Sequence, residues 1–125
     1  MTYVLLDAAV VEALHDAALN PGDLVGRARD KSLEGALERV DNRLIYGMIG
    51  DVFDLAAAYA TAIATGHYFN SGNMRTAFRT MLVFLYRNGV LIDCPMPETG
   101  DRIIALAQGL TGEADMADWL RQRAR

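Results

Sequence analysis

Apolar residues recur along most of this chain at intervals of three and four, the spacing that places side chains on one face of an α-helix. Val10, Val11 and Leu14 form such a stripe after Asp7, which can cap a helix N-terminus. Asn20-Pro21-Gly22 then ends this first helix, and Gly22 to Lys31 is a charged loop without periodicity. Ser32 can cap a second helix, whose stripe is Leu33, Leu37, Val40 and Leu44.

Two further helices are predicted in the middle of the chain. Asp51 can cap the first of them, an Ala-rich segment from Val52 to Thr65, and Gly66 stands where a helix C-terminal glycine belongs. The second runs from about Asn73 to Asn88 and is apolar most of the way round, which predicts a central, buried helix. Its stripe at i, i+3, i+4 and i+7 is Phe78, Met81, Leu82 and Leu85.

The last third of the chain predicts two shorter helices. Val90 to Ile92 could be extended, and two prolines follow it; Asp101 then caps a fifth helix that reaches about Leu110. Glu113 to about Ala124 forms a sixth. No long alternating pattern predicts a sheet, so we expect one compact all-α domain of six helices over residues 1–125.

Composition narrows the class of protein. Among 125 residues, 52% are hydrophobic, which is enough for one buried core. The net charge of -4 argues against a protein that binds nucleic acid directly, and no apolar run approaches the roughly 20 residues that span a bilayer. Cys94 is the one cysteine, so no internal disulfide can form, and no secretory signal pattern is visible. We therefore expect a cytoplasmic protein.

The segment from His67 to Arg75 combines three features of a phosphate-handling site. Small and amide residues, Asn70 to Asn73, stand directly before a long helix, whose free N–H groups and dipole favour anions. Arg75 lies in the first turn of that helix, where a cation is disfavoured unless an anion joins it. His67 is suited to taking a proton from a hydroxyl near neutral pH. Together these features predict transfer of a phosphate-containing group to a hydroxyl.

Ordinary structural roles are open for the same residues. A histidine after a helix can be purely structural, Asn73 can serve only as a helix cap, and Arg75 can pair with a neighbouring carboxylate. Phe69 is expected to anchor the loop in the core under either interpretation.

The order His67-x-Phe69-Asn70-x-x-Asn73-x-Arg75 resembles the signature of the Fic/Doc family, HxFx[D/E][G/A]N[G/K]R. The similarity is greatest to the Doc branch, the "death on curing" toxins of toxin–antitoxin modules. It extends to Leu14-His15-Asp16 in the first helix and to the run from Phe84 to Gly89. The family is all-α, with the motif loop joining two central helices.

The resemblance implies an ATP-using phosphotransferase. Doc members phosphorylate a threonine of elongation factor Tu, which stops translation, and a small Phd-like antitoxin neutralises them. By similarity, His67 is the general base, and Asn70, Gly72, Asn73 and Arg75 hold or orient the nucleotide phosphates around the loop.

This chain departs from the family pattern at two positions. Ser71 stands where the family has Asp or Glu, the carboxylate expected to hold Mg²⁺, and a serine hydroxyl is a much weaker ligand for a hard cation. Met74 stands where adenylyl-transferring members have Gly and Doc members have Lys. No metal ligand is therefore assigned. The sequence leaves open a Fic-type adenylyl transferase and a catalytically degenerate module that only binds an antitoxin.

Two features outside the motif have more than one interpretation. His15 lies mid-helix beside the apolar stripe and is expected to be a packing or hydrogen-bonding residue. The basic Gly22–Lys31 loop is either a solvated loop or a flap that docks an extended segment of the target.

Overall fold

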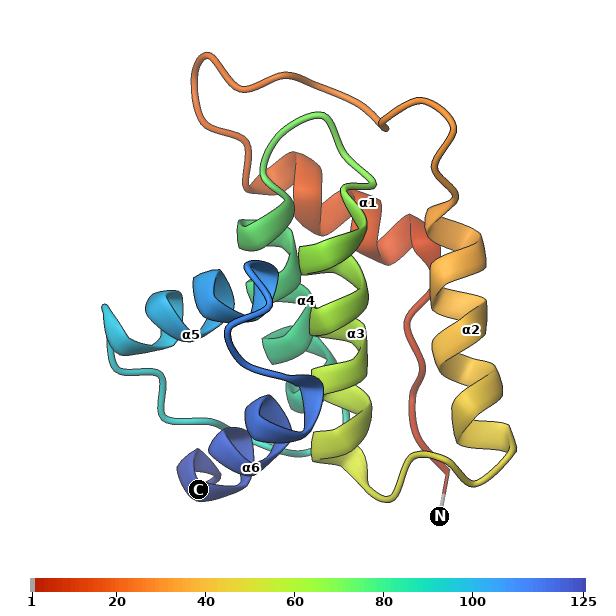
Figure 1. Cartoon of the computed structure of the whole chain (residues 1–125), viewed down its shortest axis with the longest axis vertical. Coiled ribbons are helices and arrows are strands. Elements are labelled where there is room, and N and C mark those ends of the chain that lie inside the picture. The colour runs from red at the N-terminus through yellow and green to blue at the C-terminus, as the bar shows by residue number, and fades with distance from the viewer. Residues whose placement is uncertain (1) are drawn as a thin grey trace.

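The computed structural model describes residues 2–125, and its described part contains six α-helices and no strand (Figure 1). Two helices, α3 and α4, run side by side through the centre, and the other four surround them. The bounds are α1 Ala8–Ala17, α2 Leu33–Ile45, α3 Val52–Gly66, α4 Asn73–Arg87, α5 Glu98–Ala107 and α6 Glu113–Arg123. The predicted six-helix, all-α fold is confirmed. No helix within residues 2–125 has the length and apolarity needed to cross a bilayer.

Three helix starts follow from local sequence, as predicted. The side chain of Asp7 accepts a hydrogen bond from Val10 N at 2.9 Å, and those of Ser32 and Asp51 accept from the N–H three residues on. Each bond satisfies one of the N–H groups that a helix start leaves unpaired.

The core is centred on α3, whose small side chains allow other helices to approach closely. Residues 55–60, together with Ile63 and Ala64, are buried there. On the facing side of α4, Ala77, Met81, Phe84 and Leu85 have no exposed surface. The Phe84 ring meets Tyr59 of α3 edge to face, with centroids 5.2 Å apart. This packing fixes the two helices joined by the motif loop, residues 67–72.

The predicted start of α5 is wrong, because the helix begins at Glu98 and not after Asp101. Glu98 accepts hydrogen bonds from Trp119 Nε1 and Arg123 Nη2 of α6, so contacts distant in sequence hold the first turn in place. The helix also ends at Ala107, short of Leu110. Gly109 adopts a left-handed φ of 75° and turns the chain there.

Two smaller expectations are also adjusted. Gly66 is the last residue of α3, and the left-handed position after the helix belongs to His67. The Val90–Ile92 segment forms no strand, but Ile92 makes one antiparallel bridge with Ala124.

Candidate active site

His67 follows the last turn of α3 in a strained and exposed position. Its φ of 54° and ψ of 48° lie in the left-handed region, which side chains other than glycine seldom adopt. Gly66 has a different reason to be glycine: a Cβ there would lie 1.9 Å from the ring of the buried Tyr68. Within residues 2–125, the imidazole of His67 has no hydrogen-bond partner, so its ring nitrogens are accessible from outside.

Asn73 closes the motif loop on itself. Its Oδ1 accepts from Phe69 N at 3.1 Å, and its Nδ2 donates to Phe69 O at 2.9 Å. Phe69 is 2% exposed, and its ring stacks on His15 of α1. The sequence offered Asn73 as a phosphate ligand or as a cap; the observed contacts make it a clamp on the loop backbone.

The α1–α2 loop, residues 18–32, lies along the motif loop and holds it by backbone hydrogen bonds (Figure 1). Ala28 N donates to Tyr68 O at 2.8 Å, and Asn70 N donates to Gly26 O at 3.1 Å. The Asn70 side chain donates to Val25 O at 2.9 Å. Most residues of Gly22–Lys31 are exposed, as expected of a solvated loop, while its backbone is bonded to the motif loop. Asn70 orients the two loops and is absent from the pocket lining described below.

Arg75 is held by the same α1–α2 loop. Its Nη2 donates to Asp23 Oδ2 at 2.7 Å, and its Nη1 donates to Ala18 O at 3.3 Å. The backbone N–H of Asn20 and the guanidinium of Arg75 lower the pKa of Asp23. Asp23 was not among the residues that the sequence singled out. The only hint in the sequence is that Asp23 is an acidic residue in a loop with more basic than acidic residues.

A pocket of about 500 Å³ brings the central motif residues together. It is lined by His67, Gly72, Asn73, Met74 and Arg75, by Ala64 of α3, by Ile104 and Ala107 of α5, and by Gln108 just after α5. None of the N–H groups of residues 72–75 donates to a protein acceptor in the described chain. These donors, Arg75 and the exposed imidazole can therefore meet an anion and a hydroxyl in one space.

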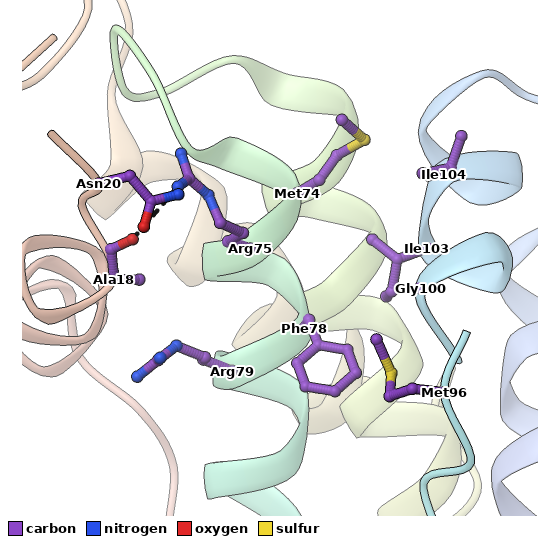
Figure 2. Close-up of a pocket in the computed structure, with 10 residues that line it drawn as sticks. All are labelled: Ala18, Asn20, Met74, Arg75, Phe78, Arg79, Met96, Gly100, Ile103 and Ile104. Atoms are coloured by element: carbon purple, nitrogen blue, oxygen red, sulfur yellow. Dashed lines mark hydrogen bonds between the residues drawn. The ribbon is translucent and has the colours of Figure 1, made fainter. Parts of the chain in front are cut away.

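A second, mostly apolar pocket of about 370 Å³ adjoins the first at Met74, Arg75 and Ile104. Figure 2 shows Met74 and Phe78 on the side of α4 that faces α5, while Arg75 and Arg79 extend toward the end of α1. The sequence did not reveal that α5 forms one side of these pockets, because no motif marks Ile103 or Ile104.

Ser71 is bonded to two other segments of the protein. Its hydroxyl accepts a hydrogen bond from Leu24 N at 3.1 Å, and its carbonyl accepts one from His15. Among residues 2–125, no three His, Cys, Asp or Glu side chains cluster closely enough to hold a metal ion.

Comparison with known proteins agrees with this geometry. A model of the Fic/DOC family matches residues 5–85, which include α1, α2, α3, the motif loop and most of α4. The chain belongs to the Fic/DOC family. The protein kinase doc of Escherichia phage P1 is 40% identical over 111 residues, which cover 88% of this chain and 87% of that protein. The resemblance to the Doc branch is therefore confirmed, and this Fic/DOC chain is similar over most of its length to a protein named as a kinase.

Proposed function

We propose that this protein is an ATP-dependent protein kinase of the Doc type, which phosphorylates a threonine of elongation factor Tu and so inhibits translation. The main evidence for this proposal is that His67 lines the same pocket as Gly72 and Arg75. A proton acceptor and an anion site thus face one space. The similarity to a protein named as a kinase favours phosphoryl transfer over adenylyl transfer.

His67 is the proposed general base. Its imidazole takes the proton of the threonine hydroxyl while the hydroxyl oxygen forms a bond to the γ-phosphorus of ATP. The bond between that phosphorus and the β–γ bridging oxygen breaks, and ADP leaves. The exposed position of His67 lets a segment of another protein reach the ring.

Arg75 and the free N–H groups of residues 72–75 are the proposed phosphate site. Arg75 is 37% exposed, and its partner Asp23 is on a loop, so a phosphate can replace that carboxylate at the guanidinium. Asn73 and Asn70 keep the loop in shape through the contacts described above. Positioning of this kind supplies most of the catalysis in phosphoryl transfer.

Magnesium enters this proposal only as an ion carried by ATP, held by the nucleotide phosphates and water. No step is assigned to it, because the Ser71 hydroxyl is already bonded to Leu24 N and no carboxylate stands at that position. Met74, which is 45% exposed at the pocket, adds no charge to replace the lysine of the Doc pattern. We expect slow turnover as a result.

A small Phd-like antitoxin is the proposed regulatory partner, and action on elongation factor Tu places the protein in the cytoplasm. Similarity to the Doc branch is the support for both parts of this proposal. Co-expression with such an antitoxin should relieve the growth arrest that the kinase alone causes.

The deciding experiment is incubation of the protein with elongation factor Tu and ATP, followed by intact-mass spectrometry. A gain of about 80 Da on the factor supports phosphoryl transfer, and a gain of about 329 Da would replace the proposal with adenylyl transfer. No mass change, together with tight antitoxin binding by calorimetry, would leave a degenerate binding module. His67→Asn is the inactive control, since asparagine tolerates the left-handed backbone.

A further inference from the structure

His15 of α1 is joined to the motif loop at two points. It is 1% exposed, and its ring lies flat on Phe69, with centroids 3.9 Å apart and an interplanar angle of 8°. Its Nε2 lies 2.7 Å from the carbonyl oxygen of Ser71, and its Nδ1 lies 3.0 Å from Asp16 Oδ1. The assigned roles of His67 and Arg75 make no use of these contacts.

The bond to Ser71 fixes the direction of one peptide group. A carbonyl can only accept, so Nε2 carries the hydrogen and donates it. The cis peptide bond of the described chain is Met96–Pro97, which means that Ser71–Gly72 is trans. In a trans peptide the N–H points opposite to the C=O. With the Ser71 carbonyl turned toward the His15 ring, the Gly72 N–H points away from that ring.

Gly72 itself faces the proposed phosphate site. Gly72 lines the 500 Å³ pocket with His67 and Arg75, and His15 does not. The Gly72 N–H has no acceptor among residues 2–125. We propose that His15 is a positioning residue: its Nε2–H holds the Ser71 carbonyl so that the Gly72 N–H is presented to the phosphate of bound ATP. This proposal rests on the function proposed above.

Gly72 has close neighbours at the position where a Cβ would project, which restricts the conformations open to this peptide. Its φ of 77° is left-handed, and a Cβ there would lie 3.1 Å from Arg75 Nη2 and 3.7 Å from His15 Cδ2. The residue that would bind the phosphate and the residue that orients the loop thus both lie close to Gly72. Loss of the His15 donor frees the Ser71 carbonyl to rotate toward the pocket, where it would repel an anion.

The test compares His15→Gln with His15→Met. The two replacements have similar shape and both lose the stacked ring, but only glutamine retains an N–H donor. A non-hydrolysable ATP analogue is titrated into each protein by calorimetry. We expect His15→Gln to bind within about threefold of the unaltered protein and His15→Met to bind about ten- to hundredfold more weakly, the loss of one charge-assisted hydrogen bond. Asp16→Asn, a change at a 61% exposed residue beside the ring, is the matched control and should change affinity little.

A second measurement uses only the unaltered protein, so it does not depend on whether a variant folds. In the unaltered protein, the ¹⁵N–¹H resonance of Gly72 should move as the analogue saturates the site, and a stationary Gly72 resonance during binding overturns the proposal. Equal affinities for the glutamine and methionine variants overturn it as well, while the proposed function stands. If the unaltered protein binds no nucleotide, the ATP-dependent function fails, and the role of His15 fails with it.

Discussion

Two arginines lie near opposite ends of α3, and their surroundings differ in kind. Arg121 of α6 meets Asp51, Asp54 and Asp118 at 3.0, 2.7 and 2.6 Å, at the start of α3. Arg75, beyond the other end of α3, meets one carboxylate, that of Asp23, at 2.7 Å. The two side chains are similarly exposed, at 35% and 37%. Their partners, and not their burial, distinguish them.

The difference separates a structural site from a candidate active site. Asp51 and Asp54 lie in the first turn of α3, where carboxylates suit the helix dipole, and Arg121 joins a favourable arrangement. The hydrogen bonds that Arg121 donates to these two carboxylates raise the pKa of Arg121 further above its already high value. Arg75 stands in the first turn of α4, where the dipole opposes it and donors are free. An anion would stabilise that turn, whereas the Arg121 cation is already surrounded by three carboxylates.

The largest expected effect is on catalysis at the Arg75 end. Changing His67 to asparagine removes the proposed base and should lower the phosphorylation rate by about 100-fold or more. Stability should change little, because the imidazole is exposed and asparagine accepts a left-handed φ. Phosphate incorporation into elongation factor Tu measures the rate, and a thermal melt measures the stability. Unchanged incorporation would remove His67 from the mechanism.

Nucleotide affinity should depend on Arg75 to a somewhat smaller degree. Arg75→Gln loses a charged donor to phosphate, and we expect the dissociation constant for ATP to rise about ten- to hundredfold. Arg87→Gln makes the same charge change in the last turn of α4 and serves as the control. If both variants weaken binding equally, the effect is one of net charge and Arg75 is not a specific ligand.

At the other end of α3, the expected effect is on folding. Arg121→Ala leaves three carboxylates without their shared cation and should lower the free energy of unfolding by about 1–2 kcal/mol, a modest value because all four groups are partly exposed. For a chain of this size, that lowers the melting temperature by roughly 4–8 °C. The specific rate of phosphorylation measured at 20 °C should stay unchanged. A large loss of rate in a folded Arg121→Ala protein would contradict the division between the two ends.

The smallest effect is expected from Asp23→Asn, which should raise the affinity for ATP, whereas Arg75→Gln should lower it. Asp23→Asn removes the carboxylate that competes with phosphate, so ATP should bind about two- to fivefold more tightly. Folding lowers the pKa of Asp23. Its carboxylate therefore stabilises the folded protein above the ordinary pKa near 3.8, and this stabilisation is lost as the pH falls through the lower pKa of the folded state. Urea unfolding between pH 5 and 3 should therefore show a weaker acid dependence in the variant. Weaker ATP binding in Asp23→Asn would mean that Asp23 positions Arg75 for the ligand.

Much of this arrangement is readable from local sequence. Asp7, Ser32 and Asp51 start their helices because a short side chain reaches an N–H three residues on, an interaction that needs no distant partner. The motif loop likewise carries its own clamp, since Asn73 bonds to Phe69 only four residues away.

Contacts between distant segments could not be predicted in this way. His15 is visibly a packing or hydrogen-bonding residue in the sequence, and the structure confirms both, but its acceptor is 56 residues away. The partner of Arg75 is 52 residues away, on a loop with no period. The early start of α5 depends on α6, through the bonds of Glu98 to Trp119 and Arg123.

The sequence by itself determined the six helices apart from the bounds of α5, the caps of α1, α2 and α3, and the order of chemical groups from His67 to Arg75, because these depend on spacing along one chain. Only the tertiary structure decided where the groups point. Packing of α1 and the α1–α2 loop against the motif loop turns the Ser71 carbonyl toward His15, gives Arg75 a single carboxylate and leaves His67 free at the pocket. Directions of this kind are set by partners that meet only when the chain folds.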